Sequence, residues 1–254
     1  MVVEISDWND LDNVRNDLTG DYVLVNDLDE NTDGYAGIGD DFEPIGFIEN
    51  DDYTSEFGGS FDGDGFHISD LVVEYDNESD IGFFASTGTG ALIENLSVDG
   101  SVTVTSAYRY FGGLVGIQRG GTIQNCVSHV DVTAVDGDRV GGLVGQNDDT
   151  VTDSYATGSI EGDERVGGLV GSNRDTIQTS YAVGLVTGNT DVGGLVGLNL
   201  ETVTDSYWDT ESTGQSTSGG GTGLTTAEMQ GSEAETNMDG FDFADVWETV
   251  EEGD

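Results

Sequence analysis

The feature that most constrains the fold is a short repeat in the middle of the chain. Four segments share the pattern apolar-Gly-Gly-Leu-Val-Gly, and they begin at Phe111, Val140, Val166 and Val192. The last three copies are spaced 26 residues apart. A self-similar period of about 20 to 50 residues is typical of solenoids, propellers and other repeat arrays.

The length of the repeat selects among these architectures. Each unit holds three short β-prone runs, for example Val140–Val144, Val151–Tyr155 and the stretch around Ile160, with Gly, Asn and Asp between them. A propeller blade needs four strands and about 40 residues, and the unit has no room for a helix. The sequence therefore predicts an all-β fold, a right-handed parallel β-helix (β-solenoid) with about 26 residues and three short strands per turn.

Stacking such turns in register places identical residues above one another. The predicted structural columns are Asn147, Asn173 and Asn199, and Tyr155, Tyr181 and Tyr207. An Asn side chain tolerates left-handed backbone and can bond to the next turn, and stacked tyrosine rings attract one another. We interpret both columns as structural.

The ends of the chain differ from the repeats and divide it into three parts. Residues 1–60 are predicted to form an N-terminal cap of a helix plus strands that leads into the solenoid, residues 61–210 the solenoid, and residues 211–254 a C-terminal cap. Ser6 is the candidate N-cap of a helix that buries Trp8, Leu11, Val14 and Leu18, and strand 22–28 follows.

In the C-terminal part, residues 212–223 are predicted to be a flexible Gly/Ser/Thr loop. Thr225 and Glu228 have the spacing of a capping box for a short helix through Met229. The aromatic residues of segment 241–247 are expected to cover the last turn, because an exposed strand edge invites aggregation.

Charge is the most unusual bulk property. The chain carries 51 acidic residues, six Arg and no Lys, for a net charge of −45. This much like charge destabilises a compact state unless salt screens it, and the screening length falls to about 3 Å at about 1 M salt. We therefore predict a protein of an extreme halophile, with monovalent cations at high concentration for stability. An acidic surface for a basic partner is the alternative. Nucleic acid is disfavoured as a partner because phosphate contacts need Lys and Arg.

Cysteine use and hydropathy exclude further classes. Cys126 is the sole cysteine, which rules out an intrachain disulfide and favours a small buried thiol. No apolar run approaches the roughly 20 residues of a membrane-spanning helix. The N-terminus does not resemble a signal peptide, so a secreted form would have lost its leader.

The repeat resembles the GLUG motif, on the pattern Gly-Gly-Leu-Val-Gly-x-Asn followed by Ser-Tyr. The flanks are similar to GLUG-containing domains as well: Phe61–Ile68 at the entry, and Tyr207–Gln215 with Gly223–Met229 at the exit. A Tyr-Pro-x-Leu ending common in the family is absent, so we expect a longer parent chain. The resemblance implies a β-helical, non-catalytic part of a large secreted or cell-surface protein, as in adhesins and some IgA-cleaving metallopeptidases.

Catalytic motifs are scarce. His67 and His129 lie in different repeats and cannot complete a zinc triad or a His-Glu-x-x-His motif. A polysaccharide lyase commonly needs a basic residue as proton acceptor, and this chain has six Arg and no Lys. A glycoside hydrolase needs two carboxylates about 5 to 9.5 Å apart. The best candidate acids are Asp62, Asp64 and Asp70.

Calcium is the cofactor that the acidic loops suit best, with Asp62 and Asp64 as the candidate ligands. No loop matches an EF-hand or the Gly-Gly-x-Gly-x-Asp repeat, and we favour diffuse binding of monovalent cations with no dedicated cofactor.

These inferences favour a non-enzymatic extracellular or cell-surface module for adhesion or surface recognition, adapted to high salt. The ligand is expected to be a surface polymer or protein, and the chain to belong to a longer protein or a homo-oligomer. The alternatives are a polysaccharide-active β-helix enzyme, a spacer, or an attachment module of a virus spike.

Overall fold

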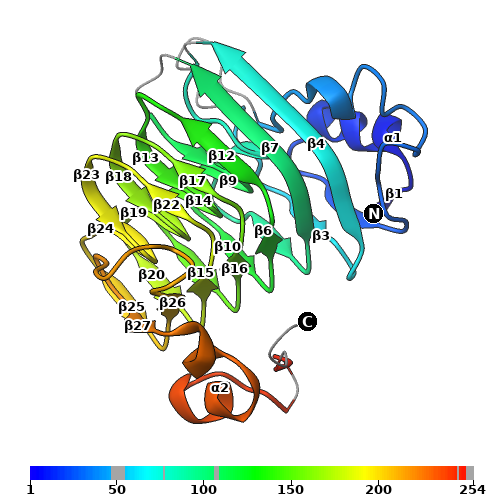
Figure 1. The fold of residues 1–254 in the computed structure, drawn as a ribbon. Coiled ribbons are helices and arrows are strands. Elements are labelled where there is room, and N and C mark those ends of the chain that lie inside the picture. Colours follow the sequence, from blue (N-terminus) through cyan, green and yellow to red (C-terminus); the bar gives the residue numbers. More distant parts are fainter. Residues whose placement is uncertain (47–54, 77, 106–108, 245, 250–254) are drawn as a thin grey trace.

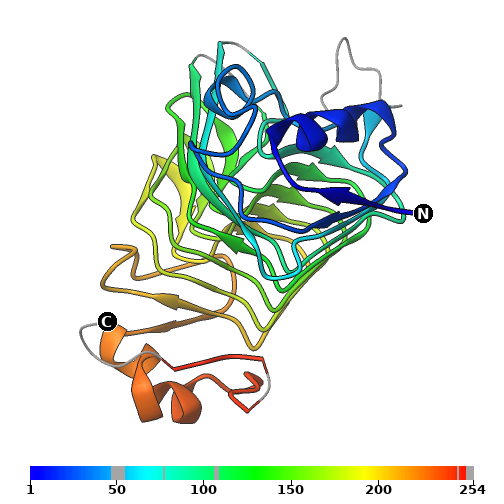
Figure 2. The same ribbon diagram turned by 90° about the vertical axis from the view of Figure 1, so that its right-hand side faces the viewer.

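The computed structural model describes residues 1–46, 55–76, 78–105, 109–244 and 246–249. The chain winds into a coil of about five turns whose strands stack in parallel, so the predicted parallel β-solenoid is confirmed (Figure 1). A small helical layer lies at the N-terminal end, and a second helical segment follows the last turn (Figure 2).

The strands belong to four parallel sheets, here named A to D. Sheet A, eight strands in stacking order, holds β1 (Val2–Ile5), β2 (Asp21–Leu24), β3 (Ser60–Asp62), β6 (Leu92–Glu94), β10 (Thr122–Gln124), β15 (Thr150–Thr152), β20 (Thr176–Gln178) and β25 (Thr202–Thr204). Sheet B holds β4 (His67–Asp76), β7 (Ser97–Thr105), β11 (Val127–Ser128), β12 (Asp131–Ala134), β16 (Tyr155–Ala156), β17 (Ile160–Glu161), β21 (Tyr181–Ala182), β22 (Val186–Thr187), β26 (Tyr207–Asp209) and β27 (Thr222–Leu224).

The other two sheets are built mainly by the Gly-Gly-Leu-Val-Gly segments. Sheet C holds β5 (Phe84–Thr87), β9 (Val115–Gln118), β14 (Val144–Asn147), β19 (Val170–Asn173) and β24 (Val196–Asn199). Sheet D holds β8 (Phe111–Gly112), β13 (Asp138–Gly141), β18 (Glu164–Gly167) and β23 (Thr190–Gly193).

The turn length shortens along the stack before it becomes constant. The in-register positions of sheet A are Ser60, Leu92, Thr122, Thr150, Thr176 and Thr202. Successive offsets are 32, 30, 28, 26 and 26 residues, so the period of about 26 is reached only in the last turns. The early turns are longer partly because β4 and β7 run as long strands where later turns have two short ones (Figure 1).

Each repeat contributes strands to four sheets where the sequence suggested three. The run Val140–Val144, expected to be one strand, is divided between β13 and β14 by a bend at Gly142 and Leu143. The glycines make this possible: a Cβ atom on Gly141 would lie 2.1 Å from the carbonyl oxygen of Val144. A Cβ atom on Gly171 would lie 2.6 Å from the backbone carbon of Arg139, in the neighbouring sheet. Sheets C and D therefore pack backbone against backbone, which only glycine permits.

The N-terminal end is closed by helices. Helix α1 (Trp8–Asp12) continues into the 3₁₀ helix η1 (Asn13–Asn16), and Trp8, Leu11 and Val14 are fully buried as the spacing predicted. The N-cap is Asp7, whose carboxylate accepts from the backbone N–H of Asp10, and the predicted cap Ser6 is one residue too early. A further 3₁₀ helix, η2, spans Gly39–Asp41.

The predicted flexible loop at residues 212–223 has ordered backbone partners. Its N–H groups and carbonyls bond to the preceding turn, for example Thr213 carbonyl with Val186 N–H at 3.1 Å and Gly219 N–H with Val196 carbonyl at 2.8 Å. The loop thus acts as a shortened last turn. The capping box of Thr225 and Glu228 is present and begins η4 (Thr226–Met229), which precedes α2 (Gly231–Asn237).

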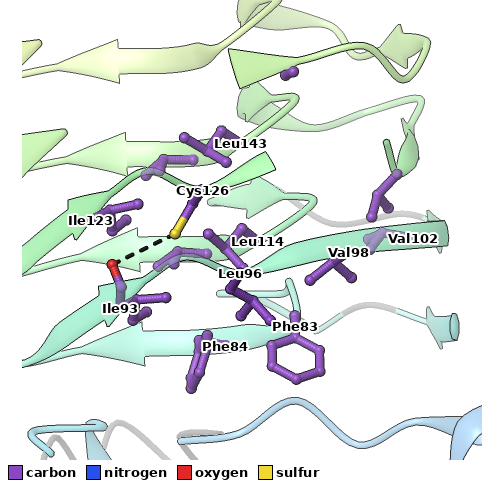
Figure 3. Close-up of a cluster of buried hydrophobic side chains, with 14 of the residues drawn as sticks. Phe83, Phe84, Ile93, Leu96, Val98, Val102, Leu114, Ile123, Cys126 and Leu143 are labelled. Atoms are coloured by element: carbon purple, nitrogen blue, oxygen red, sulfur yellow. Dashed lines mark hydrogen bonds between the residues drawn. The ribbon is translucent and has the colours of Figure 1, made fainter. Parts of the chain in front are cut away.

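The interior of the coil is one continuous apolar core (Figure 3). Phe83 and Phe84 fill the early turns, and smaller Val, Ile, Leu and Ala side chains fill the later ones. Cys126 is fully buried, with its Sγ atom 3.5 Å from the carbonyl oxygen of Ile93, which confirms a small buried thiol. Burial raises the pKa of Cys126 to about 12, so the thiol is protonated and inert at neutral pH.

Candidate recognition surfaces

The asparagine column lies at the end of sheet C and is internal. The Nδ2 atom of Asn147 donates to Oδ1 of Asn173 at 2.7 Å, and Asn173 donates in the same way to Asn199 at 2.8 Å. Asn147 and Asn173 are fully buried and also donate to the carbonyl oxygens of Thr176 and Thr202. These amides form bonds that hold adjacent turns together, which leaves little for a ligand.

The tyrosine column lies on the outside of sheet B. The rings of Tyr155 and Tyr181 are parallel, with centroids 4.7 Å apart, and Tyr207 is in register with Tyr181. Trp247 lies against both Tyr155 and Tyr181, at 5.9 and 5.5 Å between centroids. Burial raises the pKa of Tyr181, and the neighbouring Tyr155 adds to this shift.

The C-terminal aromatics lie against the outside of sheet B, over Tyr207 of the last repeat and over Tyr181 and Tyr155 of the turns before it. Phe241 contacts the rings of Tyr181, Tyr207 and Trp247. A cavity of about 340 Å³ remains between sheet B and the cap, and Asp209 lies in its wall. The carboxylate of Asp209 is occupied by Thr226 Oγ1 and by two backbone N–H groups.

Asp62 and Asp64, the calcium candidates, lie at the turn between β3 and β4. Oδ1 of Asp62 accepts from the backbone N–H of Asp64 and from Nδ2 of Asn95, both at 2.9 Å. Asp70 points elsewhere and accepts from the backbone N–H of Glu30. Within the described ranges, no three His, Cys, Asp or Glu side chains gather as a metal centre would require. Calcium therefore stays a prediction with no cluster to support it.

His129 is the more buried histidine. Its Nδ1 atom lies 2.6 Å from Thr157 Oγ1, and its ring meets Tyr155 edge-on at 6.1 Å. Burial lowers the pKa of His129, although Asp99 opposes the shift. The ring is therefore neutral at pH 7 and acts as a packing group in this wall.

The outer face of sheet A is a surface that the sequence reading did not single out. Its inward residues, such as Val151, are buried, and the side chains between them face solvent. On the last four strands the outward residues are Thr122, Gln124, Thr150, Thr152, Thr176, Gln178, Thr202 and Thr204. None is charged, although the chain has 51 acidic residues. The repeated Thr-apolar-Thr/Gln triplet was the signal that could have revealed this face.

An open groove lies beside this face, where sheet A turns into sheet B. It has a volume of about 430 Å³ and spans the corners of three successive turns. Its wall consists of Asp64, Gly65, Phe66, His67, Asn95, Leu96, Ser97, Asn125 and Val127. Phe66 is half-buried, whereas His67 and Asn125 are exposed.

Comparison with known proteins agrees with this architecture. Residues 136–161 match the GLUG motif. Halomucin of Haloquadratum walsbyi is 34% identical over 143 residues, which is 56% of this chain and 2% of halomucin. A protein of Evansella cellulosilytica, provisionally named a Gly-rich membrane protein, is 36% identical over 109 residues, 42% of this chain and 12% of that protein. The chain thus spans a small part of these relatives.

A solved structure from Bacteroides ovatus, which bears the provisional name of an immunoglobulin A1 protease, superposes with a TM-score of 0.61. It covers 92% of this chain and 87% of that one at 20% identity, a level that shows a shared fold and nothing about activity. Among the described residues, the structure has no helix with the length and apolar composition needed to cross a membrane.

Fold and repeat together define a parallel β-solenoid module built from glycine-rich turns. The GLUG match covers one complete turn, and sibling turns of the same pattern flank it. The chain therefore contains a GLUG-motif repeat within a β-solenoid of similar turns.

Proposed function

We propose that the chain is a non-enzymatic extracellular or cell-surface module that recognises a surface polymer or protein and thereby supports adhesion in molar salt. The observation that carries the proposal is the uncharged Thr/Gln face of sheet A on a chain of net charge −45. Hydroxyl and amide groups recur there at the strand spacing of about 4.8 Å. A flat array of donors and acceptors suits an extended ligand.

The relatives support the surface location. One is named a membrane protein. Both are much longer than the matched region, as expected if this region is one module within a large surface protein. High acidity supports the salt adaptation, because molar salt screens the repulsion between neighbouring carboxylates.

The test is an array of polysaccharides and surface proteins probed with the intact chain in molar KCl, with reducing-end release measured in parallel. Binding without new reducing ends is expected. Release of reducing ends would establish the polysaccharide-active enzyme instead. A chain that binds no member of the array would be a spacer, and the proposal would fall.

A further inference from the structure

The groove between sheets A and B has a polar side chain without a partner. The Oγ atom of Ser97 is buried, the residue is 8% exposed, and its hydroxyl has no hydrogen-bond partner among the described residues. Ser86, Ser128 and Ser172 also have unpaired hydroxyls, but Ser97 alone among these four lines the groove. A buried hydroxyl without a partner destabilises the fold, and a ligand hydroxyl would satisfy it.

Next to Ser97 the groove carries a chain of side-chain hydrogen bonds. Nδ2 of Asn125 donates to Oδ1 of Asn95 at 2.7 Å, and Asn95 donates in turn to Asp62 at 2.9 Å. Such bonds polarise one another, and the exposed amide of Asn125 is the outer end of the chain. It presents both a donor and an acceptor to the groove.

The remaining wall determines the chemistry of the ligand. The half-buried ring of Phe66 offers an apolar surface, and no Lys or Arg stands among the described residues that line the groove. Asp64 and the net charge of −45 disfavour an anionic ligand. A neutral ring with one apolar face and hydroxyl groups at its edge satisfies all of these groups.

The groove is part of a lane, meaning the surface over one in-register column of outward side chains on sheet B. On the C-terminal turns this lane holds a flat ring. His67, Ser97, Val127, Tyr155 and Tyr181 occupy one in-register column of sheet B. Over Tyr155 and Tyr181 the lane is filled by the ring of Trp247. Over Ser97 and Val127 the lane is the open groove.

We propose that this groove binds a sugar unit of a neutral glycan, with Ser97 and Asn125 bonding its hydroxyls and Phe66 contacting its apolar face. The inference rests on the proposed recognition function and names its ligand class. The neighbouring Thr/Gln face of sheet A would carry the next units of the same glycan. That face presents eight outward residues, fewer than the roughly 20 to 30 residues per side of a stable protein interface.

The experiment uses the intact chain in molar KCl and isothermal titration calorimetry with neutral gluco-, manno- and chito-oligosaccharides, alginate and CaCl₂. The variants are Ser97→Ala and Asn125→Gly, since glycine retains the positive φ of 51° at Asn125. Thr179→Gly is the matched control, at the same corner two turns further along and outside the groove. Urea unfolding is measured for each variant.

We expect a neutral oligosaccharide to bind and each groove variant to weaken it about three- to tenfold, the value of one hydrogen bond. Ser97→Ala should keep or raise stability while it weakens binding, which a merely structural serine would not do. Thr179→Gly should bind like the parent chain.

Unchanged binding of the neutral oligosaccharide in both groove variants would overturn the inference but leave the recognition function intact. Binding of alginate alone, or a response to CaCl₂ alone, would also overturn it. A chain that binds neither these probes nor any member of the wider array would instead refute the recognition function itself.

Discussion

The first 87 residues, through β5, and the repeat turns solve the same packing problem in different ways. In the first part, large rings fill the core: Phe83 stacks on Phe42 at 5.1 Å and meets Phe61 and Phe84 edge-on. In the repeats, small side chains, glycine contacts and the asparagine column hold turns of constant length together. The irregular turns are filled by large aromatic side chains, whereas the regular turns use the same small contact at each level.

The two regions also differ in charge. Residues 1–87 hold 24 of the 51 acidic residues, whereas residues 88–211 hold 17 and residues 212–254 hold 10. The density of carboxylates in the first region is therefore more than twice that of the repeats. If high salt stabilises the chain by screening, the two regions should not depend on it equally.

Removal of salt should have the largest effect and should separate the regions. In molar KCl, hydrogen exchange should be slow in the core strands of both. On dilution toward about 50 mM, where the screening length exceeds about 10 Å, residues 1–87 should lose protection at a higher salt concentration than residues 122–204. Exchange measured by mass spectrometry on peptides from each region is the test. Equal protection at both salt concentrations would contradict the halophilic adaptation.

Truncation of a buried side chain should cost more in the aromatic region. Phe83→Ala should lower the free energy of unfolding by about 3 to 5 kcal/mol, because a large ring leaves a cavity that the neighbouring rings cannot fill. Val166→Ala, equally buried in the repeats, should cost less than the roughly 1.5 to 3 kcal/mol gained by burial of a whole valine side chain. Urea unfolding in molar KCl measures both. Equal losses would show that the two cores are packed alike.

Sequence reasoning succeeded where the chain repeats itself. The spacing of the Gly-Gly-Leu-Val-Gly segments and of Tyr155, Tyr181 and Tyr207 predicted the parallel stack and its columns, since register follows from periodicity. It failed where a contact depends on the third dimension. The division of Val140–Val144 between two sheets requires the knowledge that Arg139 lies against Gly171, 32 residues away.

The candidate groove could not be read from the sequence for the same reason. Phe66, Ser97 and Asn125 come from three turns of different length, so no constant period connects them. Nothing in the sequence around Ser97 marks it as a binding residue. Only the burial of its hydroxyl without a partner makes it a candidate. The C-terminal aromatics were recognised as a cap, but the face that they cover depends on how the chain turns after β27.

A smaller effect should separate glycines of the two regions. Gly171→Ala places a Cβ atom 2.6 Å from backbone atoms that cannot move away singly, and it should cost about 1 to 3 kcal/mol. Gly58→Ala, outside the repeats, meets no atom closer than 3.9 Å and should change stability by less than about 0.5 kcal/mol. The same urea assay applies. A tolerated Gly171→Ala would show that sheets C and D are not in the close contact described above.

The smallest effect concerns alkaline pH and the tyrosine column of the repeats. Burial raises the pKa of Tyr181 above the value of about 10 that it has in an unfolded chain. The folded state therefore holds the neutral phenol while the unfolded state ionises. The resulting contribution is complete below pH of about 10 and is lost as the pH rises through the folded pKa. Tyr181→Phe removes this titration, so its stability should fall less steeply than that of the parent chain above pH of about 10, although the two should lie close together at pH 7. Parallel curves from pH 7 to pH 11 would mean that Tyr181 is solvated in the folded state and that Trp247 does not cover it.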